Sequence, residues 1–83
     1  MSEQEFIEAF RTTLKDLRQM QKLSQEKLAF KAGLHPTYIS LLERGKRKPT
    51  LFVIFKITKH LGVTPSSFVN NIQEELLKEN EKG

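Results

Sequence analysis

The chain has 83 residues and a net charge of +4, and it contains no cysteine. This length predicts a single domain, residues 1–83, with a small core, and the missing cysteines exclude disulfides and thiolate metal sites. No apolar run approaches the roughly twenty residues of a membrane span and no signal-peptide pattern is present, so we expect a cytoplasmic protein.

The first predicted helix runs from about Ser2 to Met20. Apolar residues recur through it at helical spacing, which gives the helix one apolar face. We expect that face to pack across the segment that follows. Its residues are Phe6, Phe10, Leu14 and Leu17, with Ile7 and Met20 alongside.

The stretch from Ser24 to Gly45 predicts two short helices that meet at an angle. Ser24 is a good N-cap, and Gly33 ends the first helix because glycine adopts the positive φ that often follows a C-cap. Pro36 suits the first turn of the second helix, which Gly45 closes. Two short helices joined in this way form a helix-turn-helix, a motif that binds DNA.

The second helix of this motif has two different faces. Ile39 and Leu42 lie three residues apart and are predicted to face the core. The opposite face offers hydroxyl groups for base edges or phosphates, an apolar group for a thymine methyl, and positive charge. We interpret it as the surface that reads DNA. Its residues are Pro36, Thr37, Ser40, Leu41 and Arg44.

Two more helices are predicted after the motif. Thr50 is expected to cap one that Gly62 ends, and Thr64 and Pro65 begin the other. No segment shows sustained apolar and polar alternation, so the predicted fold class is all-α with five helices. The expected core residues of these two helices are Leu51, Ile54, Ile57, Leu61, Phe68, Ile72 and Leu76.

The last two helices hold more large apolar side chains than a small core needs. Exposed apolar patches usually mark association, and a two-fold dimer would place two recognition helices about one DNA turn, roughly 34 to 36 Å, apart. We expect a homodimer on a pseudo-palindromic site, to which the last helix (about 65–80) contributes. The alternative that Phe52 or Phe55 thickens the core stays open. The predicted interface residues are Phe52, Val53, Phe55, Val69 and Leu77.

Positive charge is concentrated in the middle of the chain. Residues 11–59 include twelve Lys or Arg and three Asp or Glu, whereas both ends carry net negative charge. This distribution is typical of a domain whose central part contacts phosphate.

A longer pattern extends from about Phe10 to Phe68. Its residues are Leu23-Ser24-Gln25, Leu28-Ala29, Ala32-Gly33, Tyr38-Ile39-Ser40, Glu43-Arg44-Gly45 and Pro49-Thr50-Leu51. The pattern resembles the lambda-repressor-like, Xre-type DNA-binding domains, and the Thr37-Tyr38-Ile39-Ser40 run is most similar to small controller proteins of restriction-modification operons. The resemblance implies a compact five-helix fold with the helix-turn-helix at helices 2 and 3, and a sequence-specific transcriptional regulator.

The resemblance also implies which residues contact DNA. Base reading is expected from His35, Pro36, Thr37, Leu41 and Arg47, with Pro36 standing where relatives often have Arg or Gln. Phosphate contacts are expected from Ser24, Gln25, Tyr38, Ser40, Arg44, Lys46 and Lys48.

Three of the polar residues have structural interpretations as well. His35 is alternatively a helix cap, and Tyr38 is alternatively a core aromatic whose hydroxyl lies at the rim. Glu43 is expected to pair with a neighbouring cation, such as Arg18, or with a backbone group, because DNA would repel its charge.

Neither catalysis nor a metal or other cofactor is predicted. Ser40 and the distant His60 do not form a nucleophile and base, and the two histidines lack metal-ligand spacing. The expected partners are double-stranded DNA, a second copy of the chain and RNA polymerase, with no small-molecule site evident. The alternative is an antitoxin-type protein-interaction module in which DNA binding is secondary or absent. The basic run from Arg44 to Lys48 favours the DNA regulator.

Overall fold

The computed structural model describes the backbone of residues 1–82 and the side chains of residues 1–78. Its helices are α1 (Glu3–Met20), α2 (Gln25–Ala32), α3 (Pro36–Glu43), α4 (Leu51–Thr58) and α5 (Pro65–Lys82). Within residues 1–82 no strand is present. The predicted all-α class and the number of helices are therefore confirmed.

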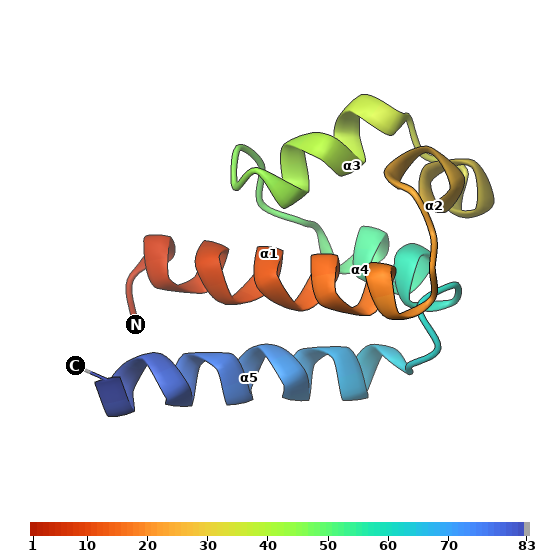
Figure 1. Cartoon of the computed structure of the whole chain (residues 1–83). Helices are drawn as coiled ribbons and strands as arrows, with labels where there is room; N and C mark the ends of the chain where they lie inside the picture. The colour runs from red at the N-terminus through yellow and green to blue at the C-terminus, as the bar shows by residue number, and fades with distance from the viewer. Residues whose placement is uncertain (83) are drawn as a thin grey trace.

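The long helices α1 and α5 run antiparallel, and α3 lies on the other side of α1 (Figure 1). Phe10 of α1 and Phe68 of α5 are fully buried and meet edge to face, with ring centroids 5.9 Å apart. Ile39 and Leu42 of α3 are equally buried in the same core. The apolar inner face of α3 thus fixes the orientation of its outer face.

Local side-chain chemistry sets where the helices begin and end. The Ser24 hydroxyl accepts a hydrogen bond from the Lys27 N–H at 3.0 Å, and the Thr50 hydroxyl accepts one from the Val53 N–H at 3.1 Å. Gly33 follows α2 with φ = +68°, in the left-handed region that glycine enters without strain. These observations confirm the predicted caps and the break between the motif helices.

One predicted helix end and the expected placement of two apolar residues are wrong. α4 ends at Thr58 and a turn leads to Gly62, although Leu61 in that turn is buried as predicted. Met20 is 73% exposed because it lies at the very end of α1, where the chain turns away. Leu51 is 66% exposed, because it falls in the first turn of α4 at the margin of the core face.

Candidate nucleic-acid interface

α3 turns one face to the core and the other to solvent. His35 caps the helix, since its Nδ1 accepts a hydrogen bond from the Thr37 N–H at 3.1 Å. Pro36 and Thr37 are exposed in the first turn. The helix lies on the side of the molecule away from α5 (Figure 1). The start of the predicted reading face is therefore exposed to solvent.

Three of the predicted contact residues on α3 are only half-exposed. Tyr38 packs against the core, which supports the core-aromatic interpretation of its ring. Ser40 and Leu41 retain part of their surface beside the reading face.

The start of α2 places two predicted phosphate contacts next to each other. The Ser24 oxygen accepts the capping hydrogen bond, which leaves its O–H free to donate. Gln25 Nε2 donates to Glu43 Oε1 at 3.0 Å, so one of its amide hydrogens is already in use. Since a helix N-terminus attracts anions, this position suits a phosphate group.

Arg18 and Glu43 form the predicted ion pair. Arg18 Nη2 donates to Glu43 Oε1 at 2.8 Å, and Arg18 Nη1 donates to the Leu23 carbonyl at 2.7 Å. The hydrogen bond to Glu43 raises the pKa of Arg18, so the guanidinium stays charged. Arg18 belongs to α1 and Glu43 to α3, and the hydrogen bond from Gln25 of α2 to Glu43 joins a third helix to the pair.

The basic segment, residues 44–48, follows α3 directly. Gly45 makes the turn with φ = +73°, and the four cationic side chains are exposed. Two contacts join this segment to α1: Arg11 Nη1 donates to the Arg44 carbonyl at 3.3 Å, and Lys48 Nζ lies 3.0 Å from Glu3 Oε2. The cations are Arg44, Lys46, Arg47 and Lys48.

Sequence reasoning missed Arg11. Glu8, three residues earlier, indicates only a local ion pair on the helix, and its Oε2 lies 3.6 Å from Arg11 Nε. Its contact with the basic segment joins residues 33 positions apart, a separation that no spacing rule reveals.

A second exposed surface, the apolar patch, lies where α4 meets α5. It is defined by Leu51, Phe55 and Val69, which line a hollow together with Pro65 and Ser66. Their exposed fractions are 66%, 58% and 48%. Phe52 and Leu77, both predicted for a dimer interface, are also exposed.

The prediction for Val53 is wrong. Val53 is 8% exposed and packs in the core with Ile54 and Ile57. Helical spacing permits either orientation, since Leu51 lies three residues before Ile54 and Val53 four before Ile57, and the packing of α4 buries Val53. Leu51, predicted for the core, is exposed on the surface instead of Val53.

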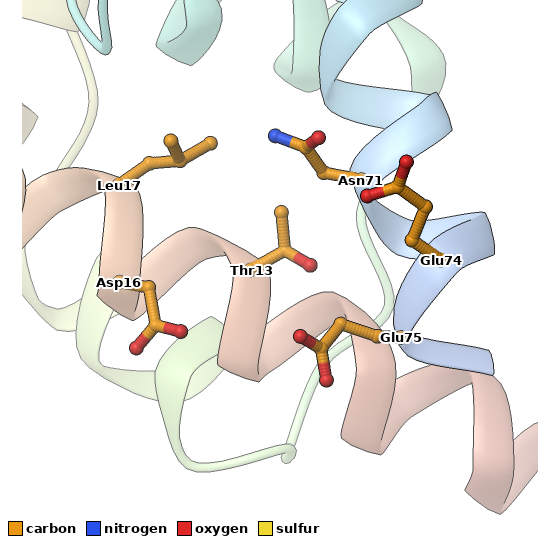
Figure 2. Close-up of a pocket in the computed structure, with 6 residues that line it drawn as sticks. All are labelled: Thr13, Asp16, Leu17, Asn71, Glu74 and Glu75. Carbon is orange, nitrogen blue, oxygen red and sulfur yellow. The ribbon is translucent and has the colours of Figure 1, made fainter. Parts of the chain in front are cut away.

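An acidic groove lies along the junction of α1 and α5. Figure 2 shows Asp16 of α1 and Glu74 and Glu75 of α5 around it, with Thr13, Leu17 and Asn71 completing the lining. Its carboxylates would repel phosphate, so this groove is not part of the nucleic-acid interface. Among the residues that the structure describes, no cluster of His, Asp or Glu is arranged to hold a metal ion, and no helix is long and apolar enough to cross a membrane.

Comparison with known families yields one model that covers most of the chain. The family is HTH_3, helix-turn-helix, and it matches residues 14–68. The match begins on α1 and ends on α5, so it includes the whole motif and the basic segment.

Three known proteins illustrate the similarity. The control protein C.BamHI of Bacillus amyloliquefaciens is 54% identical over 48 residues, which are 58% of this chain and 59% of that protein's length. The control protein C.MunI of a Mycoplasma species is 40% identical over 67 residues, 80% of this chain and 90% of that protein. The restriction-modification controller protein C.Esp1396I, solved as a tetramer with its natural 35 base-pair operator, superposes with a TM-score of 0.80 at 31% identity, covering 93% of this chain and 99% of that one. These matches confirm the resemblance found in the sequence.

Proposed function

Because this chain belongs to the helix-turn-helix family HTH_3 of DNA-binding transcription regulators, we propose that it recognises a pseudo-palindromic operator as a homodimer. We further propose that it is a controller protein of a restriction-modification system. C.Esp1396I, to which it is similar, is a restriction-modification controller protein, and C.BamHI and C.MunI are named control proteins.

The observation that supports this function best is the outer surface of α3. Thr37 is exposed in the first turn of a helix whose other side is anchored by two fully buried residues. A recognition helix enters the major groove with its N-terminal residues at the base edges. In that position Thr37 would read bases, and the basic segment would reach the flanking phosphates.

The residues around Thr37 would make different kinds of contact with DNA. His35 Nδ1 is occupied by the capping bond, so the neutral ring offers Nε2–H as a donor to a base or phosphate. Pro36 contributes only apolar contact. Leu41 meets a thymine methyl, and Arg47 extends towards a base or a phosphate.

The apolar patch supports the homodimer. A two-fold axis there would pair Leu51, Phe55 and Val69 with the same residues of a second copy, and Phe52 and Leu77 would lie at the border. The relative C.Esp1396I is described as a tetramer on its operator, which fits repeated use of such a dimer. The bound dimer would act by occluding or recruiting RNA polymerase on nucleoid DNA.

Two measurements test this proposal. Selection of bound duplexes from random DNA is expected to return a pseudo-palindrome whose half-sites lie about one helical turn apart. Titration of that duplex over a salt series is expected to weaken binding steeply, because cationic side chains release the counterions of phosphates. Affinity that is flat in log salt would contradict the proposal and leave a protein-interaction module.

Two variants separate base reading from phosphate contact. Thr37→Ala is expected to reduce the discrimination between bases at one operator position by about 1–3 kcal/mol. Lys46→Ala is expected to weaken binding to all duplexes alike and to lower the slope of log affinity against log salt by about 1. Gln73→Ala, exposed on α5, is the control. An unchanged ranking in Thr37→Ala would show that the reading face is assigned wrongly.

A further inference from the structure

Lys48 is already bound to a carboxylate when DNA is absent. Its Nζ lies 3.0 Å from Glu3 Oε2, and the two residues are 45 positions apart in the chain. Glu3 is the first residue of α1, whereas Lys48 ends the basic segment. The contact therefore joins the acidic start of α1 to the surface proposed to hold phosphate.

The fold keeps these two groups near each other. At the other end of the basic segment, Arg11 of α1 donates to the Arg44 carbonyl, and a Cβ built on Gly45 would lie only 3.1 Å from Ile7 Cγ2. The segment thus lies close against the outer edge of α1 at Arg44 and Gly45 and again at Lys48. Glu3 is consequently held within reach of Lys48.

We propose that Glu3 acts as an internal substitute for a DNA phosphate, which the duplex must displace from Lys48. A carboxylate and a phosphate oxygen both accept charge-assisted hydrogen bonds from an ammonium group, so they compete for the same donor. This inference rests on the proposed function. It makes Glu3 a residue that limits affinity for duplex DNA without touching bases.

The size of the effect follows from exposure. The Lys48 and Glu3 side chains are 57% and 66% exposed, so water and salt screen their attraction. Exposed pairs of this kind are weak, so we expect the Glu3–Lys48 pair to reduce the affinity for duplex DNA by roughly two- to five-fold at low salt. The effect should shrink as salt is added, since the internal pair and the phosphate contact are screened together.

The test compares two variants that remove one negative charge from the same helix. Glu3→Gln breaks the pair, whereas Asp16→Asn changes the net charge equally but lies 13 residues along α1, on the acidic groove. Binding of a duplex of scrambled sequence is measured at low salt by fluorescence anisotropy. We expect Glu3→Gln to bind two- to five-fold more tightly than Asp16→Asn.

A double-mutant cycle shows whether the gain passes through Lys48. In a Lys48→Ala background, the gain in affinity from Glu3→Gln is expected to disappear, while thermal unfolding checks that each variant folds. Equal binding by Glu3→Gln and Asp16→Asn, or a gain that persists without Lys48, would overturn the inference. Failure of the wild-type protein to bind any duplex would instead overturn the proposed function.

Discussion

Single residues fix both ends of α3. His35 caps its first turn, and Glu43 in its last turn is held by Arg18 and Gln25. The two contacts differ in environment, because His35 is exposed and Glu43 is 7% exposed. Leaving a buried charge without its partner costs more folding free energy than leaving an exposed backbone N–H without its capping acceptor.

Replacing Arg18 with Met is expected to destabilise the protein by about 3–5 kcal/mol, because Glu43 would remain as a buried carboxylate without a cation. The free energy of unfolding in urea measures this loss. The double variant Arg18→Met with Glu43→Met removes both charges and should be more stable than Arg18→Met alone. A single variant as stable as the wild type would contradict this view of the pair.

Replacing His35 with Ala should cost about 1 kcal/mol of unfolding free energy, since the Thr37 N–H loses its acceptor. His35→Asn is the matched control, because asparagine is itself a strong N-cap residue and restores the bond. Urea unfolding of both variants distinguishes the cap from other roles of the ring. If Ala and Asn prove equally stable, the cap contributes nothing measurable.

The start of α1 is an element whose stability depends on pH. Ser2 and Glu5 form a capping box, in which each side chain accepts a hydrogen bond from the backbone N–H of the other, both at 3.1 Å. Hydrogen bonds from Ser2, chiefly that of its backbone N–H, hold the pKa of Glu5 below 4.5. The ionised carboxylate therefore stabilises the folded helix at pH above 4.5.

We expect the first turn of α1 to fray as the pH falls below 4.5 and through the lowered pKa of Glu5. Helical Cα chemical shifts of the first turn, followed by NMR during acidification, measure this change. Glu5→Gln keeps an acceptor for the Ser2 N–H without a titrating charge, so its first turn should respond much less. An identical response in the variant would assign the fraying to another group.

The ends of the helices were predictable because their causes are local. Ser24, Gly33 and Thr50 each act on backbone within about three residues, so the sequence around them contains the necessary information. The outward face of α3 was predictable for a similar reason, since Ile39 and Leu42 mark the inward side by spacing alone.

The orientation of α4 was not predictable in the same way. Leu51 and Val53 are both apolar residues in its first turn, and one is exposed while the other is buried. Which of them faces inward depends on where α5 packs, a tertiary contact that helical periodicity does not contain. The links from Arg11 to Arg44 and from Glu3 to Lys48 were hidden for the same reason.

Across the whole molecule, the basic segment and the acidic groove lie on different sides of α1, and Glu3 and Glu8 are paired with Lys48 and Arg11 on the basic side. α3 lies on one side of α1 and α5 on the other (Figure 1). The basic segment follows α3, and the acidic groove is lined by residues of α1 and α5. An uneven charge distribution orients a protein as it approaches a polyanion. The phosphate backbone should thus attract the α3 side and repel the α5 side, which favours productive encounters.

The apolar patch links assembly to the stability of the whole molecule. A chain of this length buries a modest apolar area by itself, so covering Leu51, Phe55 and Val69 in a dimer would add appreciably to its stability. Association that involves only the folded state makes stability depend on protein concentration. Each tenfold increase should stabilise a folded dimer by about 1.4 kcal/mol.

The thermal midpoint of the wild-type protein is therefore expected to rise with protein concentration, whereas that of Phe55→Lys should not, because a lysine in the patch opposes its own symmetry copy. Sedimentation should report a dimer and a monomer respectively. Phe30→Lys is the matched control: Phe30 is 83% exposed, more than Phe55, but lies on α2 outside the patch. A midpoint independent of concentration in the wild type would contradict the dimer itself. A loss of the dimer in Phe30→Lys alone would place the two-fold axis elsewhere, and with it the spacing of the two recognition helices.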